Sequence, residues 1–245
     1  MEEEILGKYQ HVYNYEADRQ RKFRALIILI SSFLVFLLTV LGLTDWFSEL
    51  TFSYLEKNLG FTNKWSKSFG PEWFVGLNKD IAALGGFSLL FIFLIISIVY
   101  YHLRKENRRL WRLLFIVIVG GTLMLITKSI FTIHLPDDPI EIIINSISPF
   151  PSGHAMMGII FYTTLGVTIA RRQHSHKIKI FIIVASVIIT ILIGIARVLP
   201  NSHTLTEVLA GWSLGLTWLS MCWLLERYIK KNRVKKSALT ELPDQ

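Results

Sequence analysis

The sequence contains 245 residues, of which 52% are hydrophobic and only 18% are charged, and its mean hydropathy is +0.46. Soluble domains carry about 25% charged residues, so this composition excludes both an ordinary soluble domain and a disordered chain. A single cysteine, Cys222, excludes a disulfide scaffold. The net charge of +8 would indicate nucleic-acid binding if the basic residues formed one patch on a soluble fold, but their positions in the sequence exclude that.

Six stretches contain no Asp, Glu, Lys or Arg: residues 25–44, 81–103, 113–127, 142–170, 180–196 and 208–225. A helix of about 20 apolar residues is needed to cross the bilayer core, and each stretch approaches or exceeds that length once its flanking residues are included. The sequence therefore predicts an all-α integral membrane protein with six transmembrane helices. Gly120, Gly121, Gly211 and Gly215 are expected to allow close contact between these helices.

The basic residues predict how the helices are oriented. If the N-terminus is cytoplasmic, 20 of the 26 Lys and Arg residues fall in the cytoplasmic segments 1–24, 102–112, 171–179 and 227–245. Cytoplasmic loops are enriched in Lys and Arg, so both termini are predicted to be cytoplasmic. The basic residues then indicate topology and contact with anionic lipids, and no nucleic-acid partner is expected.

This topology divides the chain into three parts. They are a cytoplasmic segment at residues 1–24, a transmembrane domain at 25–229 and a basic cytoplasmic tail at 230–245. Within the domain, residues 44–79 are rich in aromatic side chains. Aromatic rings gather at the membrane interface, so this outer stretch is expected to form an interfacial loop or one or two short helices.

Three separate stretches bring polar residues to the predicted outer face. Lys128 follows the third helix, Pro151-Ser152-Gly153-His154 opens the fourth, and Arg197 ends the fifth. Ionisable side chains near a membrane are costly, and they usually face a cavity or one another. Because the three stretches share one face, they predict a site, although Lys128 and Arg197 have an alternative interpretation as interfacial anchors.

The residue types at this face suit a phosphate. Lys128 and Arg197 are cations that hold oxyanions. Pro151 favours the start of a helix, so Ser152 and Gly153 are expected to present free backbone N–H groups at its positive end. Gly153 also lets a bulky anion approach closely, because it has no side chain.

Two histidines supply the chemistry that a phosphate site needs. His203 and Glu207 are four residues apart and would share one face of a helix, so Glu207 can hold one ring nitrogen while the other attacks. His154 can protonate the leaving oxygen as a general acid. His and Glu at this spacing can also ligate zinc, but no further carboxylate–histidine cluster completes a metal shell.

These residues resemble the type-2 phosphatidic acid phosphatase superfamily, membrane lipid phosphatases that share a site with vanadium haloperoxidases. The family has the motifs Lys-x6-Arg-Pro, Pro-Ser-Gly-His and Arg-x5-His-x3-Asp. The second motif is intact at residues 151–154, and the third runs from Arg197 through His203 with Glu207 in place of Asp. In the first motif, Lys128 and Pro136 are in register, but Leu135 replaces the arginine. Residues 80–86 also resemble the start of the second helix in many bacterial members.

The resemblance implies a metal-independent enzyme that needs no cofactor. It implies that His203 is the nucleophile and forms a phosphohistidine, that Glu207 orients it and that His154 is the acid. It further implies that phosphate is bound by Lys128, Ser152, Gly153 and Arg197. The Glu207 change keeps the charge, whereas Leu135 removes a phosphate contact worth about 1.5–3 kcal/mol. An active but altered enzyme is expected, because both histidines and Arg197 are present.

The sequence thus predicts a lipid phosphatase that removes a phosphate or diphosphate at the outer leaflet of a bacterial inner membrane. Candidate substrates are undecaprenyl diphosphate, phosphatidylglycerol phosphate, phosphatidic acid and lipid A phosphate. The expected partners are the lipid substrate and membrane lipids; the sequence does not determine an oligomeric state. A lipid phosphotransferase and a catalytically silent lipid-phosphate binder or transporter remain as alternatives.

Overall fold

The computed structural model describes residues 15–46, 49–50, 53–54, 71–132, 150–200 and 202–240. Seven helices account for most of the described residues. The described part of the chain contains no strand. They are α2 (Tyr15–Val40), α4 (Glu72–Ala83), α5 (Phe87–Leu103), α6 (Asn107–Thr132), α8 (Gly153–Ala170), α9 (His176–Val198) and α10 (Leu205–Thr240). The all-helical prediction is confirmed for this part of the chain.

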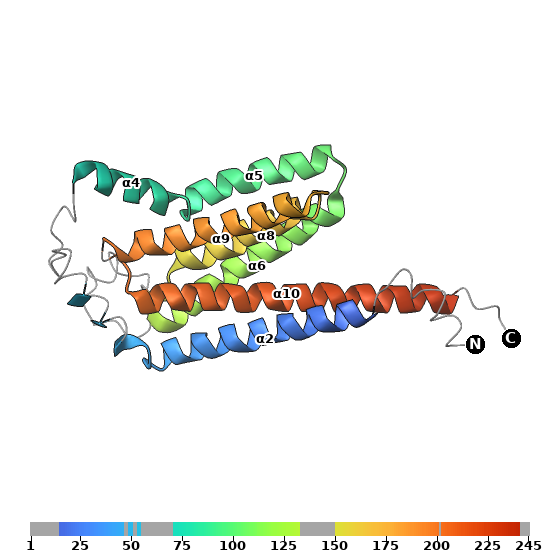
Figure 1. The fold of residues 1–245 in the computed structure, drawn as a ribbon, viewed down its shortest axis with the longest axis horizontal. Helices are drawn as coiled ribbons and strands as arrows, with labels where there is room; N and C mark the ends of the chain where they lie inside the picture. Colours follow the sequence, from blue (N-terminus) through green and yellow to red (C-terminus); the bar gives the residue numbers. More distant parts are fainter. Residues whose placement is uncertain are drawn as a thin grey trace.

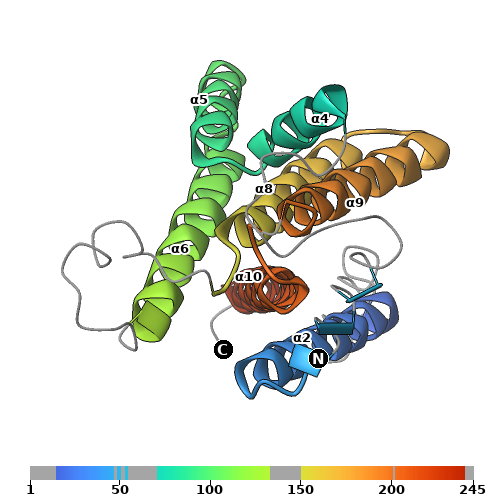
Figure 2. The ribbon, with the colours of Figure 1, turned by 90° about the vertical axis from the view of Figure 1, so that its left-hand side faces the viewer.

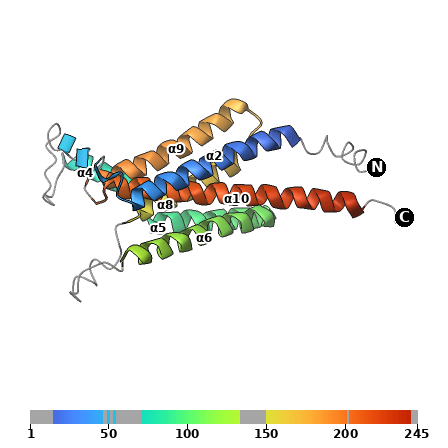
Figure 3. The same cartoon turned by 90° about the horizontal axis from the view of Figure 1, so that it is seen from below.

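The helices lie roughly along one axis and alternate in direction (Figure 1). At one end, α6 and α9 finish while α8 and α10 begin; at the opposite end, α2 begins and α10 finishes (Figures 1 and 3). The 36-residue α10 extends beyond its neighbours at that second end. We call the end where α8 and α10 begin the catalytic end, because the predicted site residues lie there. We call the end where α10 finishes the basic end, because most Lys and Arg residues lie there.

Helix α8 forms the centre of the bundle. It packs against α6, α9 and α10, while α2 packs on the far side of α10 (Figure 2). Met156, Ile160 and Phe161 of α8 are completely buried, as is Ile193 of α9. This core fixes the start of α8, where the predicted phosphate-binding residues lie.

Glycines allow the helices of this core to approach closely. A Cβ atom on Gly120 would lie 2.9 Å from Ile160 Cδ1, and one on Gly211 would lie 2.6 Å from the Ser152 carbonyl oxygen. At Gly215 an added Cβ would also clash, with Ile159 of α8. At Gly121 it would lie no closer than 3.8 Å to a neighbour. The prediction of close contacts is therefore confirmed at three of the four glycines and is wrong at Gly121.

The outer surface of the bundle is apolar, as expected of helices that face lipid. Leu34, Ile118 and Phe181 are examples of large hydrophobic side chains that are more than half exposed. Five described helices are long and apolar enough to cross a membrane, and the pair α4–α5 would add a sixth as one bent span. Between their ends, helices satisfy their backbone hydrogen bonds internally, which suits them to this environment.

The predicted second span differs from the uninterrupted helix expected over residues 81–103. Helix α4 begins at Glu72, inside the stretch predicted to be interfacial, and the chain bends by 46° between α4 and α5. A contact with α8 holds the break in place, because the hydroxyl of Tyr162 in α8 donates a 2.8 Å hydrogen bond to the Leu84 carbonyl oxygen. Gly85 lies at the same break, and a Cβ there would sit 3.0 Å from the His154 carbonyl oxygen.

Candidate active site

The first turn of α10 is closed by reciprocal hydrogen bonds between Thr204 and Glu207. The Glu207 N–H donates to Thr204 Oγ1 at 3.2 Å, and the Thr204 N–H donates to Glu207 Oε2 at 3.2 Å. This arrangement is a capping box, which the sequence Thr204-Leu-Thr-Glu207 encodes directly. It fixes the Glu207 carboxylate at the start of the helix, and the sequence analysis did not use this signal.

The same carboxylate holds His203. Glu207 Oε2 lies 2.7 Å from His203 Nδ1, and both side chains are largely buried, at 14% and 10% exposure. The predicted contact is therefore present, but its cause differs from the one expected. His203 precedes α10 in a bend, so the cap turn and not a shared helix face brings the two together. In the neutral imidazole, a carboxylate acceptor at Nδ1 selects the tautomer with the proton on Nδ1, in which Nε2 carries the lone pair.

Arg197 is joined to His203 through the backbone. The His203 N–H donates to the Arg197 carbonyl oxygen at 3.1 Å, which fixes the short connection between α9 and α10. The preceding carbonyl, that of Ala196, accepts a 3.0 Å hydrogen bond from the buried Asn78 amide of α4. Asn78 was missed in the sequence analysis, where the only signal was an uncharged amide just before a long apolar stretch.

The N-terminus of α8 packs directly on the first turn of α10. The Ser152 N–H donates to the Glu207 carbonyl oxygen at 3.0 Å, so it is not free as predicted. Helix α8 begins at Gly153 with Ser152 as its N-cap, and Pro151 lies outside the helix. The N–H groups of Gly153, His154 and Ala155 occupy the first helical turn, whose donors have no acceptor within the helix. These three donors, and the positive end of the helix dipole, are available to an anion.

Lys128 reaches this same turn from α6. A Cβ atom on Gly153 would lie 3.4 Å from Lys128 Cε, so the lysine side chain passes over the glycine. Lys128 also lies within electrostatic range of Arg197 and Glu207. His154, in turn, is within electrostatic range of Arg197, His203 and Lys128. The structure thus brings together all seven residues predicted from three distant parts of the sequence.

Two buried polar atoms in this cluster have no hydrogen-bond partner among the described residues. They are the hydroxyl oxygen of Ser152, which is fully buried, and the Nε atom of Arg197. An unsatisfied buried polar group costs about 1–3 kcal/mol, so both atoms would gain from a partner that enters the site. An oxygen-rich anion would satisfy both.

Some of the predicted residues lie outside the described part of the chain. These are Leu135 and Pro136 of the first motif. Within the described residues, no three His, Cys, Asp or Glu side chains are grouped closely enough to hold a metal ion.

Comparisons with known proteins identify the family of this chain. A sequence model of the PAP2 superfamily matches residues 109–231. The chain is 29% identical over 169 residues to phosphatidylglycerophosphatase B of Bacillus subtilis, an alignment that covers 66% of this chain and 80% of that protein. It is also 35% identical over 91 residues to a PA-phosphatase related-family protein of Dictyostelium discoideum, covering 35% of this chain and only 25% of the relative.

The fold matches a solved structure as well. The crystal structure of a transmembrane PAP2-type phosphatidylglycerolphosphate phosphatase from Bacillus subtilis superposes with a TM-score of 0.64 at 20% identity, covering 82% of this chain and 96% of that one. The chain therefore belongs to the PAP2 superfamily, and it has the fold of a transmembrane member. The resemblance inferred from its motifs is confirmed.

Proposed function

We propose that this protein is a membrane lipid phosphatase that hydrolyses a phosphate monoester through a phosphohistidine on His203. The observation that supports this most is the 2.7 Å contact between His203 Nδ1 and Glu207 Oε2, because it turns Nε2 of the imidazole away from the carboxylate and makes it available to attack phosphorus. An oriented imidazole with a buried carboxylate behind it is an activated nucleophile. Among the candidate lipids we favour phosphatidylglycerol phosphate, because a relative with that activity in its name aligns over most of its length.

In the first step, His203 Nε2 attacks phosphorus in line with the leaving oxygen. The new P–N bond forms as the P–O bond to the lipid breaks, and His154 donates its proton to the departing alkoxide. Lys128, Arg197, the Ser152 hydroxyl and the first-turn N–H groups of α8 bind the non-bridging oxygens. Charge stabilisation of this kind is the main protein contribution to phosphoryl transfer.

In the second step, His154 has become a base. It removes a proton from a water molecule as that water attacks phosphorus, the P–N bond breaks, and the bonding electrons return to His203 Nε2. Inorganic phosphate leaves, and His154 is protonated again for the next cycle. Glu207 stabilises the positive charge on the His203 ring while the intermediate exists, since it accepts the Nδ1 proton's hydrogen bond throughout.

Two features support a location at the outer face of a bacterial inner membrane. The catalytic end lies opposite the basic end, and Lys and Arg residues favour the cytoplasmic side. The lipid would reach the site from the outer leaflet, with its phosphate at the start of α8 and its chains along the apolar helix surfaces. No cofactor is required by this scheme.

The test is phosphate release by the purified protein from a panel of lipid mono- and diphosphates, with EDTA present. We expect release from phosphatidylglycerol phosphate that persists in EDTA and is abolished in His203→Ala. The matched control is His174→Ala, which removes an exposed histidine from the turn between α8 and α9. Full turnover in a folded His203→Ala protein would contradict the proposal.

The remaining outcomes distinguish the alternatives. Release that depends on an added lipid acceptor, with a new phosphorylated lipid among the products, would identify a phosphotransferase. Binding of the lipid without any release would identify a silent binder. Loss of release in EDTA, restored by a divalent metal, would contradict the metal-independent mechanism.

A further inference from the structure

A cavity lies at the basic end of the bundle, far from His203. Its volume is about 1200 Å³, above the roughly 300–1,000 Å³ typical of small-molecule sites. Residues of α2, α6, α8 and α10 line it, and Arg171 just after α8 completes the wall. The proposed catalytic chemistry uses none of these residues.

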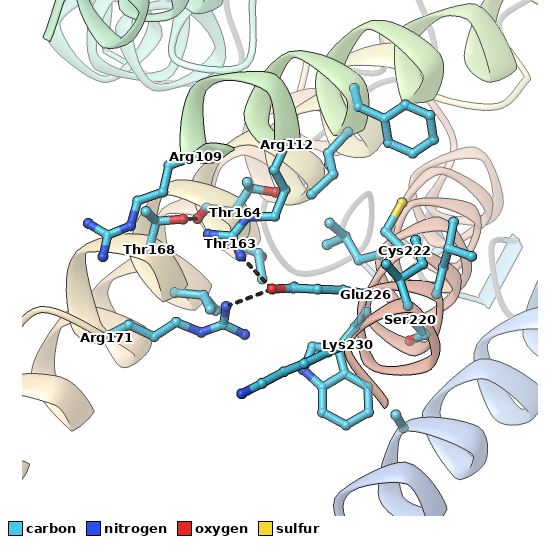
Figure 4. Close-up of a pocket in the computed structure, with 18 of the residues that line it drawn as sticks. Arg109, Arg112, Thr163, Thr164, Thr168, Arg171, Ser220, Cys222, Glu226 and Lys230 are labelled. Carbon is cyan, nitrogen blue, oxygen red and sulfur yellow. Dashed lines mark hydrogen bonds and ion pairs between the residues drawn. The ribbon is translucent and has the colours of Figure 1, made fainter. Parts of the chain in front are cut away.

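The cavity is strongly cationic. Eight Lys or Arg side chains line it, and Glu226 is the only acidic side chain among the lining residues. Glu226 is already engaged, because Arg112 Nη1 lies 2.6 Å and Arg171 Nη1 lies 3.7 Å from its Oε1 atom (Figure 4). One carboxylate therefore cannot neutralise the positive charge gathered here.

Most of the other cations that line the cavity have no acidic partner among the described residues. In the described part of the chain, no ion pair is formed by the lining residues Arg21, Arg24, Arg108, Lys230 and Arg233. They come from three helices, α2, α6 and α10, so they surround the opening from different sides. A ligand with concentrated negative charge would match this rim.

The pKa of Arg171 reflects the positive charges gathered around it. Its burial, and then the nearby charges of Arg112, Arg227 and Arg109, lower the pKa of its guanidinium below the ordinary value, while Glu226 opposes this shift. A bound anion would relieve the same repulsion.

Polarity changes along the cavity in a regular way. The cations occupy the outermost turns, whereas the inner wall contains Ile28, Phe115, Ile116, Val167 and Leu219. Arg108 and Ile116 are eight residues apart on α6, which corresponds to about 12 Å along the helix. The cavity thus has a charged mouth at the depth of lipid headgroups and an apolar interior at the depth of acyl chains.

We infer that this cavity binds an anionic phospholipid of the leaflet at the basic end, with its phosphate against the arginine rim and its chains along the apolar wall. A soluble anion would use the rim but not the interior, and a neutral lipid would use the interior but not the rim. Both parts together select an anionic lipid. The site is separate from the catalytic end, so this inference stands whether or not the proposed phosphatase activity is found.

Native mass spectrometry of the delipidated full-length protein in detergent tests this. The probes are phosphatidylserine, phosphatidylcholine with the same chains, and glycerophosphoserine, which has the headgroup but no chains. We expect phosphatidylserine to be retained about tenfold more tightly than either of the others. Equal retention of phosphatidylcholine, or equal binding of the chain-free headgroup, would overturn the inference.

Matched variants locate the bound lipid. The double variant Arg24→Gln with Arg108→Gln removes two rim charges and should weaken phosphatidylserine retention about tenfold or more. Its control, Arg19→Gln with Arg104→Gln, removes two exposed arginines at the same end that do not line the cavity, and should retain lipid like the wild type. Equal loss in both would show general surface attraction and no site.

Two further comparisons complete the design. Arg197→Gln, at the catalytic end, should leave retention unchanged; loss there would place the lipid in the catalytic site and overturn the inference. If the double variant does not fold, Lys230→Gln and its exposed neighbour Lys231→Gln form a milder pair, and only Lys230 lines the cavity. Equal lipid retention by Lys230→Gln and Lys231→Gln would overturn the inference. So would a wild-type protein that forms a stable dimer and binds no lipid.

Discussion

Glu207 performs two tasks with one carboxylate. Its Oε2 atom lies 2.7 Å from His203 Nδ1 and also accepts the Thr204 N–H at 3.2 Å. The capping bond positions the carboxylate, and the carboxylate positions the imidazole. The nucleophile is therefore held by the same interactions that start α10, which explains how a residue outside the helix can be oriented as firmly as one within it.

Replacing Glu207 by Gln separates these tasks. Glutamine also serves in a capping box, so the helix start should be preserved. The neutral amide cannot stabilise a positive imidazole ring, so we expect kcat to fall by about 10²- to 10⁴-fold. Phosphate-release kinetics and thermal unfolding measure the two effects. Glu207→Ala is the contrasting variant, because it should lose activity and also about 1 kcal/mol of stability. Unchanged kcat in Glu207→Gln would contradict the role assigned to the carboxylate.

At this scale the sequence predicted which residues meet but not how they meet. The spacing of Arg197, His203 and Glu207 identified the cluster, whereas the helix start that creates the contact was placed wrongly. The Ser152 N–H was expected to be free and instead donates to Glu207. Asn78 and Tyr162 were missed because their partners are backbone carbonyl oxygens of other helices, and a single sequence gives no signal for such a contact.

At the scale of helices, charge-free stretches predicted the spans well because the bilayer sets their length. Five of the six stretches correspond to described helices. Polar turns lengthen some of these helices, as at the start of α2, which begins at Tyr15, and at the end of α10, which continues to Thr240, whereas α8 begins only at Gly153. The break between α4 and α5 was not predicted. It depends on Tyr162 and on the close approach of Gly85 to His154, and both are contacts with α8.

Both the stability and the activity of the protein are expected to depend on the contact between α8 and α10. In Gly211→Ala, the new Cβ would lie 2.6 Å from the Ser152 carbonyl oxygen, which is backbone and cannot move aside. We expect a loss of about 1–3 kcal/mol in stability and a lower kcat, because the start of α8 shifts away from His203. Thermal unfolding and phosphate release measure the two effects.

Gly121→Ala is the matched control for this variant. It makes the same change in α6, where the nearest atom is 3.8 Å from the new Cβ, so stability and activity should stay near wild type. Equal behaviour of the two variants would show that the contact between α8 and α10 does not position the site.

Over the whole molecule, the two ends of the bundle differ in chemistry. The catalytic end gathers Lys128, His154, Arg197 and His203, and the basic end contains the arginine-lined cavity. This separation follows from the alternating direction of the helices, and the positions of Lys and Arg predict which end faces the cytoplasm.

Cysteine accessibility tests that orientation. In a Cys222→Ser background, we expect a membrane-impermeant maleimide to label Ser202→Cys in intact cells, because this exposed residue lies at the catalytic end. Ser175→Cys, exposed in the turn between α8 and α9 at the basic end, should react only after the membrane is opened. The reverse pattern would place the site in the cytoplasm.

In the proposed mechanism His203 becomes phosphorylated, and that state can be trapped and located. We would mix the His154→Ala variant with p-nitrophenyl phosphate, quench in alkali and map the phosphate by mass spectrometry. This leaving group needs no acid, whereas breakdown of the intermediate needs the base that His154 supplies, so the intermediate should accumulate. The account predicts phosphate on His203, and none when His203→Ala is added. Phosphate on another residue, or continued turnover with His203 removed, would contradict it.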